Sequence, residues 1–420
     1  MKARYDSYKD SGASWIGDIP AGWECSKLKY YASIRSGDVI QSTEIRDDGA
    51  YPIYGGGKII GYCNTYNMRD NEIIVGRVGS CGHVTLPQTK CWATDNALVI
   101  SPKNVDLKFI FYVLDSANLN QYNESNAQPL ITSTKIKNVS IPLPPLPEQR
   151  AIAAYLDQRC RHIDEYTASL QREATLAREL KQALIAQAVT RGLDTSVPMK
   201  DSGVAWIGQV PAGWEVRRAK YLFANTSAGV WGEDERGDEN DIVCFRVADF
   251  DYTHGCLKFD KITVRNIPSE QLKGRIVHKG DLLLEKSGGG DLSPVGRVVR
   301  CNYEGKATCS NFMQVMTVKD GYSADFIYYY FFAAYSNRVN LLYINQTTGI
   351  QNLNMGEFMS QKLPLPPLPE QRAIASYLDG RCAAIDAYVA SLEREAALAR
   401  EMKQREIADA VTGKVRVFDQ

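Results

Sequence analysis

Two long segments dominate the pattern of apolar and polar positions, and both predict helices. Residues 142–157 read PLPPLPEQRAIAAYLD, and residues 364–379 repeat fifteen of these sixteen positions. After Pro147, which suits a first helical turn because it has no N–H group to lose, no proline or glycine occurs up to Arg191. The second segment continues with a single glycine until Gly413. A helix of about 44 residues is about 66 Å long, several times longer than the usual globular helix.

Within both predicted helices, apolar residues recur at heptad spacing, which is typical of a coiled coil. We assign to its core Ile152, Leu156, Ile163, Tyr166, Leu170, Leu180 and Leu184 in the first helix, and Ile374, Leu378, Ile385, Tyr388, Leu392 and Met402 in the second. A helix this long with few large apolar residues needs a partner. We therefore expect the two helices to pair as an antiparallel coiled coil. The alternative is that each helix packs separately on its own globular domain.

The whole chain is a tandem repeat. Residues 8–24 return at 199–215 with the shared pattern KDSG, WIG and PAGWE. Strand signals broken by glycine, followed by helical stretches, predict that the two globular domains are mixed α/β, so that the fold class is α+β with pseudo-twofold repetition. The predicted parts are a lead-in segment at 1–19, a first globular domain at 20–141, a connector and long helix at 142–192, a linker with a second lead-in segment at 193–210, a second globular domain at 211–363, a connector and long helix at 364–413, and a tail at 414–420.

The repeat also predicts where the chain ends meet. The first helix leads through a linker into the second lead-in segment, whereas the second helix is followed by only a few residues. The N-terminal MKARYDSYKDSG has the sequence of the missing continuation. We therefore expect the end of the second helix to lie beside the N-terminal segment.

Composition excludes several classes of protein. The chain has 49 basic and 49 acidic residues and a formal net charge of zero, so no overall positive field indicates a nucleic-acid partner, and charge-driven binding must be local or supplied by another subunit. Ten cysteines form no CxxC pair and only four histidines accompany them, which argues against zinc. Without a signal peptide or an apolar run near eighteen residues, we expect a soluble cytoplasmic protein with reduced thiols and no membrane contact.

No pattern indicates catalysis. The glycine-rich stretches 55–61 and 288–290 do not match GxGxxG or GxxxxGK[ST], so neither a dinucleotide site nor a P-loop is predicted. His83, His254 and His278 have no nucleophile motif nearby. We therefore expect no catalytic residues, no metal and no cofactor bound by this chain.

The proline-rich runs before the helices have two interpretations. They are either ligands for a polyproline-binding domain or stiff extended spacers that fix each globular domain relative to its helix. Their identical placement before both helices favours the spacer.

The order of these parts carries a resemblance to a known family. A WIG…PAGW segment, a variable glycine-rich domain, PPLPEQRAIA and a long helix, all repeated once, resemble the specificity subunit of type I restriction-modification systems over essentially the full length. GRVGSCG at 76–82 and TTGIQNLN at 347–354 look like further hallmarks of that family. The first domain departs from the pattern, because it has QPLITSTKI where the second has TTGIQNLNM.

The resemblance implies a DNA-recognition subunit without catalytic activity of its own. Each globular domain would be a target recognition domain that reads one half of a bipartite double-stranded DNA site, and the helix pair would set the length of the spacer. Two modification subunits, which use S-adenosylmethionine to methylate adenine, would dock on it, and two restriction subunits would join with ATP and Mg. A repeated scaffold with two near-identical faces independently predicts two copies of one partner.

Candidate DNA contacts are polar residues in the glycine-rich regions, where arginine can pair with guanine and asparagine or glutamine with adenine. In the first domain these are Lys58, Arg77, Ser80, Thr94 and Asn96. In the second they are Arg246, Lys286, Ser287, Arg297, Asn311, Gln346 and Thr347. Aligning the domains sets Arg77 against Lys286 and Asn96 against Asn311. The two asparagines would then be equivalent, which leaves open a turn-stabilising role instead of base contact.

Two other classes of function remain open. One is a DNA-binding coiled-coil scaffold or regulator outside restriction. The other is a methyltransferase or nuclease with a cryptic site, against which the missing motifs argue.

Overall fold

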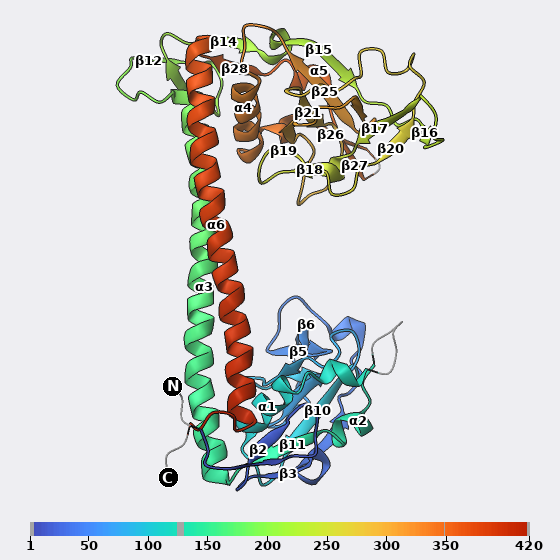
Figure 1. Cartoon of the computed structure of the whole chain (residues 1–420), viewed down its shortest axis with the longest axis vertical. Helices are drawn as coiled ribbons and strands as arrows, with labels where there is room; N and C mark the ends of the chain where they lie inside the picture. The colour runs from blue at the N-terminus through green and yellow to red at the C-terminus, as the bar shows by residue number, and fades with distance from the viewer. Residues whose placement is uncertain (1–3, 124–129, 348, 418–420) are drawn as a thin grey trace. The chain divides into compact units, whose positions relative to one another are not determined.

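The computed structural model describes residues 4–123, 130–347 and 349–417 (Figure 1). The contacts between residues divide the chain into two units. The first unit comprises Met1–Gln171 with Arg394–Gln420, and the second comprises Arg172–Glu393.

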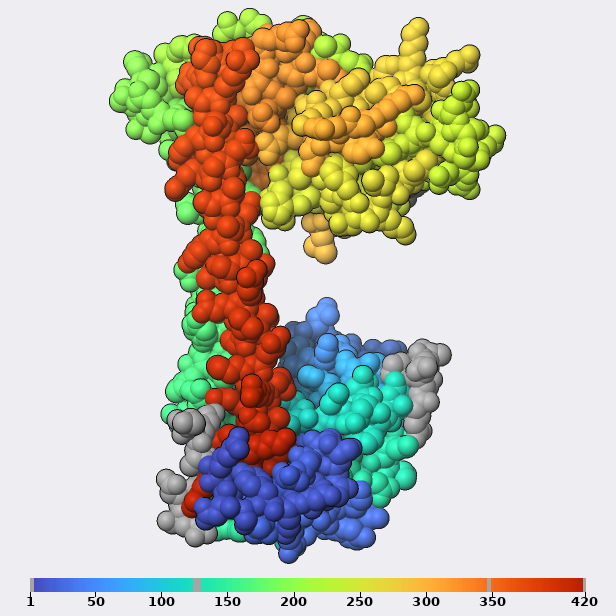
Figure 2. All heavy atoms as spheres, in the orientation of Figure 1, coloured from blue at the N-terminus to red at the C-terminus, as the bar shows by residue number. Residues whose placement is uncertain are grey.

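Two long helices, α3 (Leu146–Arg191) and α6 (Leu368–Val411), confirm the predicted helical segments. They are 46 and 44 residues long, and each contributes one part to each unit. Within each unit the two helices pack side by side and antiparallel (Figures 1 and 2). The predicted antiparallel pair is therefore confirmed, and the alternative of separately packed helices is excluded.

The seam between the helices differs from the prediction in one of its two sets of heptad positions. Leu156, Ile163 and Leu170 are buried as expected, but the other seam positions of α3 lie four residues after each of these, not three, and are Cys160, Thr167 and Ala174. In α6, Leu378 and Leu392 alternate in the same way with Cys382, Val389 and Ala396. Because these alternate residues are small or short, the two helices pack closely.

The assignment of four residues to the seam is therefore wrong. Tyr166, Leu180, Tyr388 and Met402 are between 45% and 59% exposed. The two tyrosines lie on the flank of the seam, where the hydroxyl of Tyr166 donates to Glu395 and that of Tyr388 donates to Glu173. Among the remaining assigned residues, Leu184 and Ile385 are half-buried, whereas Ile152 and Ile374 are fully buried, each in the core between its helix and the neighbouring globular domain.

Polar pairs cross the seam at positions that repeat after 222 residues. Lys181 Nζ lies 2.6 Å from an Asp386 oxygen in the second unit, and Lys403 Nζ lies 2.7 Å from an Asp164 oxygen in the first. Lys181 is the more enclosed lysine, with 12% of its side chain exposed. The tandem repeat of the sequence is thus also a repeat of cross-helix contacts.

The described residues of the globular domain of the first unit form four small sheets and two α-helices. The strands are β1 (Tyr8–Asp10) with β2 (Asp18–Pro20); β3 (Glu24–Lys27) with β11 (Ser140–Leu143); β4 (Ala32–Ser36), β10 (Ala97–Pro102), β7 (Ile73–Gly76) and β8 (Val84–Thr85) in this order; and β6 (Lys58–Cys63), β5 (Tyr51–Gly55) and β9 (Trp92–Ala93). Helix α1 (Leu107–Ser116) packs in the main core with the four-stranded sheet, and α2 (Ser133–Lys137) is short. The domain is mixed α/β, as predicted.

The second unit repeats this arrangement with sheets that contain more strands. Its strands are β12 (Met199–Asp201) with β13 (Gln209–Pro211); β14 (Glu215–Arg218) with β28 (Lys362–Leu365); β15 (Phe223–Ala228), β25 (Met313–Val318), β21 (Leu282–Glu285), β23 (Val298–Arg300), β19 (Cys256–Leu257) and β18 (Phe250–Asp251); β16 (Glu233–Asp234), β20 (Val264–Asn266), β17 (Asp241–Phe245) and β24 (Ala307–Cys309); and β22 (Ser287–Gly288), β27 (Ile350–Leu353) and β26 (Ile344–Thr347). Helices α4 (Ala324–Ser336) and α5 (Met355–Phe358) complete it.

The PEQ motif at the start of each long helix fastens that helix to its globular domain. The amide of Gln149 donates to the carbonyl of Pro144 and accepts from the N–H of Asp106, the N-cap of α1, at 2.8 and 2.9 Å. Gln371 makes the same two bonds, to Pro366 and from the N-cap Ser323 of α4. The prolines just before this motif lie in or beside the paired strands β11 and β28, which supports the spacer interpretation of the connector.

The chain ends meet in the first unit as the repeat predicts. The hydroxyl of Tyr8 donates to the carbonyl of Gly413 at 3.1 Å. Trp23, Ile407 and Val411 belong to one core. In the second unit Val210, Trp214 and Val189 share a core in the same way. A lead-in segment and the tryptophan that follows it therefore cover the end of each long helix.

Candidate nucleic-acid interface

Four loops of the second domain converge at one edge of its sheets, which we call the loop edge. They are residues 229–232 after β15, 246–248 after β17, 286–290 around β22 and 310–312 before β25. Together they line a cavity of about 530 Å³ whose walls include Trp231, Arg246, Ser287, Asn311 and Phe312. The structure therefore brings three predicted contacts, Arg246, Ser287 and Asn311, to one surface.

The first domain has a corresponding edge, formed by the loops at 37–39, 55–57, 77–82 and 94–96, but its cavity lies only beside the loop at 77–82 and the neighbouring Lys58. A cavity of about 490 Å³ is walled by Lys58, Ser80, His83 and Asn120, together with glycines of the GRVGSCG segment. Lys58 is exposed at the start of β6, and Ser80 is half-buried in the loop after β7. Two predicted contacts of the first domain thus also share a surface, which is more polar than that of the second domain.

Backbone hydrogen bonds define which residues of the two edges are equivalent. In the first domain Ala97 N–H donates to Thr94 O, and Arg77 N–H donates to Asn96 O. In the second, Met313 N–H donates to Ser310 O, and Lys286 N–H donates to Phe312 O. Arg77 therefore corresponds to Lys286 as expected, but Asn96 corresponds to Phe312.

The expected pairing of Asn96 with Asn311 is therefore wrong by one residue. The equivalent of Asn311 is Asp95, and both turns expose two consecutive side chains between buried neighbours. The two asparagines occupy different positions of the turn, so they do not share one turn-stabilising role.

Two predicted contacts are enclosed within their own domains. Thr94 is 4% exposed, because it is the buried first residue of its turn. Arg297 is held by Glu285 through two hydrogen bonds of 2.8 and 3.3 Å and lies over the Tyr252 ring at 3.8 Å. The burial of Thr94 and the ion pair of Arg297 with Glu285 argue against both side chains as base contacts. The side chains of Gln346 and Thr347 fall outside the part of the structure that is described.

The remaining basic residues of the edges are partly enclosed. Burial lowers the pKa of the Lys286 ammonium. Arg77 and Arg246 are half-buried, and within the described part of the chain their Nε atoms have no hydrogen-bond partner. A buried N–H group without a partner costs free energy, so both guanidinium groups favour an incoming acceptor.

Sequence reasoning missed the two aromatic residues of the second edge, Trp231 and Phe312. Phe312 is 43% exposed, and Trp231 stacks on Arg265, whose Cζ lies 4.5 Å from the ring. The available signal was their position: Trp231 stands between Val230 and Gly232, and Phe312 lies in a polar turn, where an aromatic residue has no core to fill.

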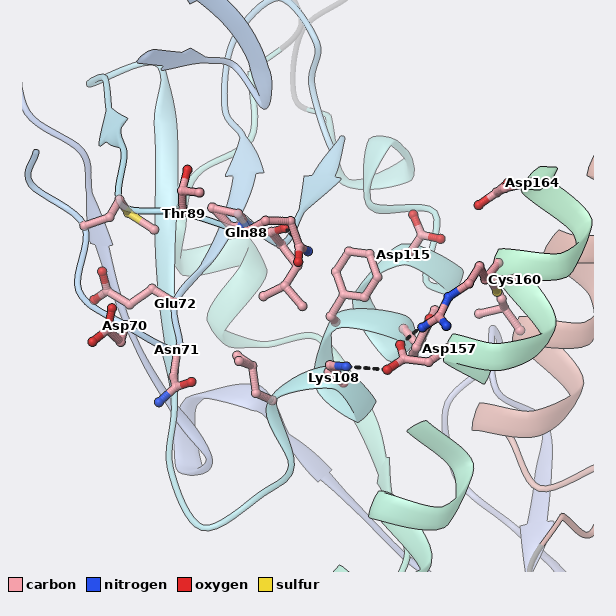
Figure 3. A pocket seen from close by; sticks show the side chains of 18 of the residues that line it. Asp70, Asn71, Glu72, Gln88, Thr89, Lys108, Asp115, Asp157, Cys160 and Asp164 are labelled. Carbon is pink, nitrogen blue, oxygen red and sulfur yellow. Dashed lines mark hydrogen bonds and ion pairs between the residues drawn. The ribbon is translucent and has the colours of Figure 1, made fainter. Parts of the chain in front are cut away.

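A larger cavity of the first unit has a different character. It measures about 800 Å³ and lies between α1 and α3 and the loops at 68–72 and 86–90 (Figure 3). Lys108 and Asp115 of α1 face Asp157, Cys160 and Asp164 of α3 in the close-up, and Lys108 pairs with Asp157. Burial raises the pKa of Asp115. With six acidic and five basic lining residues, this surface does not suit the DNA backbone.

Metal and thiol chemistry find no support in the described residues. No cluster of three histidine, cysteine or acidic side chains is placed to hold a metal ion there. All ten cysteines are free thiols, and burial raises the pKa of Cys91 and Cys244 to about 12 and that of Cys301 to about 11. Such thiols are inert packing groups at neutral pH. Among the described helices, none has the length and apolar character needed to cross a bilayer.

Comparisons with known proteins agree with this architecture. A family model for the type I restriction modification DNA specificity domain matches residues 20–174 and 211–386, more than half of the chain. The putative type I restriction enzyme MjaX specificity subunit of Methanocaldococcus jannaschii is 24% identical over 441 positions, which cover 96% of both chains. The EcoprrI specificity subunit of Escherichia coli is 29% identical over 164 residues, but the match spans only 40% of that protein and 37% of this chain.

A solved structure shows the same fold. One chain, from work on complex assembly and conformational transition of the type I R-M system, aligns with a TM-score of 0.68 at 16% identity and covers 94% of this chain and 98% of that one. Specificity subunits of type I systems are non-catalytic. The repeated domains, the antiparallel helix pair and both family matches show that this chain belongs to the type I restriction-modification DNA specificity subunits.

Proposed function

We propose that each globular domain reads one half of a bipartite double-stranded DNA site in the major groove. The observation that carries the proposal is the pair of loop edges, which share backbone hydrogen bonds but differ in side chains. A common framework with different groups at its exposed positions is what two domains need to recognise different half-sites. The domain limits that we propose are residues 20–141 and 211–363, with 142–192 and 364–413 as connectors and helices.

We also propose that the helix pair sets the spacer and docks two modification subunits. In support, the helices carry two exposed apolar pairs at equivalent positions: Leu176 and Leu180 on α3, in the second unit, and Leu398 and Met402 on α6, in the first. Residues four apart lie on one helix face, so each pair forms an apolar patch. Two patches of the same chemistry suit two copies of one partner.

The proposed complex assigns the chemistry to other subunits. The modification subunits use S-adenosylmethionine to methylate adenine, two restriction subunits use ATP and Mg, and this chain binds none of these cofactors. The complex acts on DNA in the cytoplasm. The net charge of zero suits a reading subunit whose partners supply much of the phosphate contact.

Exchange of residues 211–363 for the second domain of another family member tests the reading proposal. We expect the hybrid, expressed with its modification subunit, to methylate a site with a changed second half and an unchanged first half and spacer. Sequencing of methylated adenines in the host genome measures both halves at once.

The reciprocal exchange of residues 20–141 is the matched control and should change only the first half-site. A hybrid in which both halves change, or neither, contradicts one domain reading one half. If pull-down of the wild-type chain recovers no modification subunit, a DNA-binding scaffold outside restriction becomes the better description.

Charge introduced into one apolar patch is expected to remove one docked partner. Leu176→Glu with Leu180→Glu eliminates two buried contacts of about 1.5–3 kcal/mol each, enough to weaken that site more than a hundredfold. Native mass spectrometry should then count one modification subunit where the wild type holds two. The control Gln182→Glu with Ala183→Glu adds the same charge to exposed positions of the same helix and should leave two. Retention of both subunits by the leucine variant would exclude the patch as a docking site.

A further inference from the structure

We propose that the loop edge of the second domain reads a thymine methyl group and a guanine, and that the first domain lacks both contacts. Phe312 and Trp231 form the apolar wall for the methyl group, and Arg246 donates to the guanine. This inference rests on the proposed function and names the base chemistry of one half-site.

The apolar wall is exposed yet held in place. The backbone carbonyl of Phe312 accepts from the N–H groups of Lys286 and Ser287 at 2.9 and 3.1 Å, which fixes the turn that presents the ring. Trp231 is braced by Arg265, whose guanidinium also donates to the carbonyls of Trp231 and Gly232 at 3.2 and 3.1 Å. Two fixed aromatic side chains at a solvent-facing cavity suit a small apolar group on a ligand.

Arg246 is an arginine of this region that remains able to bind a base. Its backbone N–H donates to Asp249 at 2.7 Å, whereas among the described residues its side chain makes one long contact, of 3.4 Å, to the same residue. Arg297, in contrast, is fully committed to Glu285. A guanidinium that keeps donors free in a cavity wall can form the two parallel hydrogen bonds that guanine O6 and N7 accept.

The first domain has different groups at all three equivalent positions. Asn96 replaces Phe312, as the shared turn shows. Thr94 N–H donates to Tyr54 O where Ser310 N–H donates to Phe245 O, so Gly55 replaces Arg246. Likewise Asp38 N–H donates to Ala93 O where Val230 N–H donates to Cys309 O, so Val39 replaces Trp231.

These replacements change the chemistry of recognition. The thymine methyl is the apolar group that the major groove presents, and phenylalanine is one of the side chains that contact it. An asparagine at the same place offers an amide, which pairs with adenine. The two edges therefore read different bases through the same backbone frame.

Base analogues test the inference one atom group at a time. After the methylated motif has been sequenced, the full-length chain with its modification subunit is titrated against duplexes in which each thymine of the second half-site is replaced by deoxyuridine. One replacement should weaken wild-type binding about fourfold, the value for one buried methyl group. The same replacement should not change binding by Phe312→Ala. To test Arg246, each guanine of the second half-site is replaced by 7-deazaguanine. One such replacement should weaken DNA binding by the wild type about tenfold and should not change DNA binding by Arg246→Ala.

Asn96→Ala is the matched control, because it alters the equivalent turn of the first domain and should keep the deoxyuridine effect intact. Thermal unfolding confirms that each variant is folded. Specific binding that is indifferent to every deoxyuridine, a Phe312→Ala response equal to that of wild type, or a second half-site without thymine or guanine would overturn this inference alone. A wild-type complex with no preference for any half-site would overturn the proposed function and the inference with it.

Discussion

Insertion of seven residues into both α3 and α6 is expected to lengthen the unread spacer by about three base pairs. One heptad adds about 10.5 Å to a helix, and the rise per base pair is about 3.4 Å. The insertions belong between Gln171 and Arg172 and between Glu393 and Arg394, equivalent positions of the repeat that keep the seam in register. A heptad leaves the helix only about 20° short of two whole turns, so each domain should keep nearly its original orientation about the helix axis.

The DNA itself turns by about 100° over three base pairs, so we also expect weaker binding at the new spacer than the wild type shows at its own. Methylome sequencing reads both quantities, because the motif gives the spacer and the methylated fraction gives the occupancy. Insertion into α3 alone is the control; it breaks the pairing of Lys181 with Asp386 and should abolish methylation. Unchanged spacing with altered half-sites would show that the helices do not set the spacer.

Asp386→Ala is expected to destabilise the second unit by about 3 kcal/mol. The substitution leaves Lys181 in the seam with 12% of its side chain exposed and only the carbonyl of Thr253, at 2.9 Å, as a partner. Asp164→Ala removes the equivalent partner of Lys403, but the Asp164 side chain is 61% exposed, so its loss should cost less than about 1 kcal/mol. Denaturant unfolding measures the free energy of unfolding of both variants. It thereby compares the loss of the same lysine–aspartate contact at a buried and at an exposed position.

A second substitution separates the cost of a stranded charge from the value of the pair. Lys181→Met in the Asp386→Ala background replaces the ammonium by an apolar side chain and should recover most of the lost stability. Equal destabilisation by Asp386→Ala and Asp164→Ala, or no recovery in the double variant, would show that burial does not govern this contact.

The long helices could be predicted because proline, glycine and heptad spacing act locally. The seam could be predicted only in part. Tyr166 and Leu180 have the apolar character of core residues, but the packed helices place Thr167 and Lys181 in the seam instead. Lysine was not assigned to a core because its burial depends on a partner, Asp386, that is 205 residues away.

In the candidate site, too, features set by neighbouring residues could be predicted, whereas contacts between residues far apart in the sequence could not. The sequence identified the glycine-rich loops, and Arg246, Ser287 and Asn311 indeed line one cavity. It did not reveal that Arg297 is bound to Glu285 or that Thr94 is buried, since both depend on how strands pair. The alignment of Asn96 with Asn311 was wrong by one residue. It matched two identical residues, whereas the backbone hydrogen bonds of the turn make Asn96 equivalent to Phe312.

The glutamine at the start of each long helix has a consequence for how such genes diversify. Gln149 and Gln371 hold their domains by a backbone N–H at the start of α1 or α4, and any helix start can offer that donor. A recombination junction placed just upstream of this glutamine would therefore join an unrelated globular domain to the same long helix, and the glutamine would hold it by the same kind of hydrogen bond. New recognition specificities could then arise by exchange of whole globular domains, without compensating substitutions in the long helices.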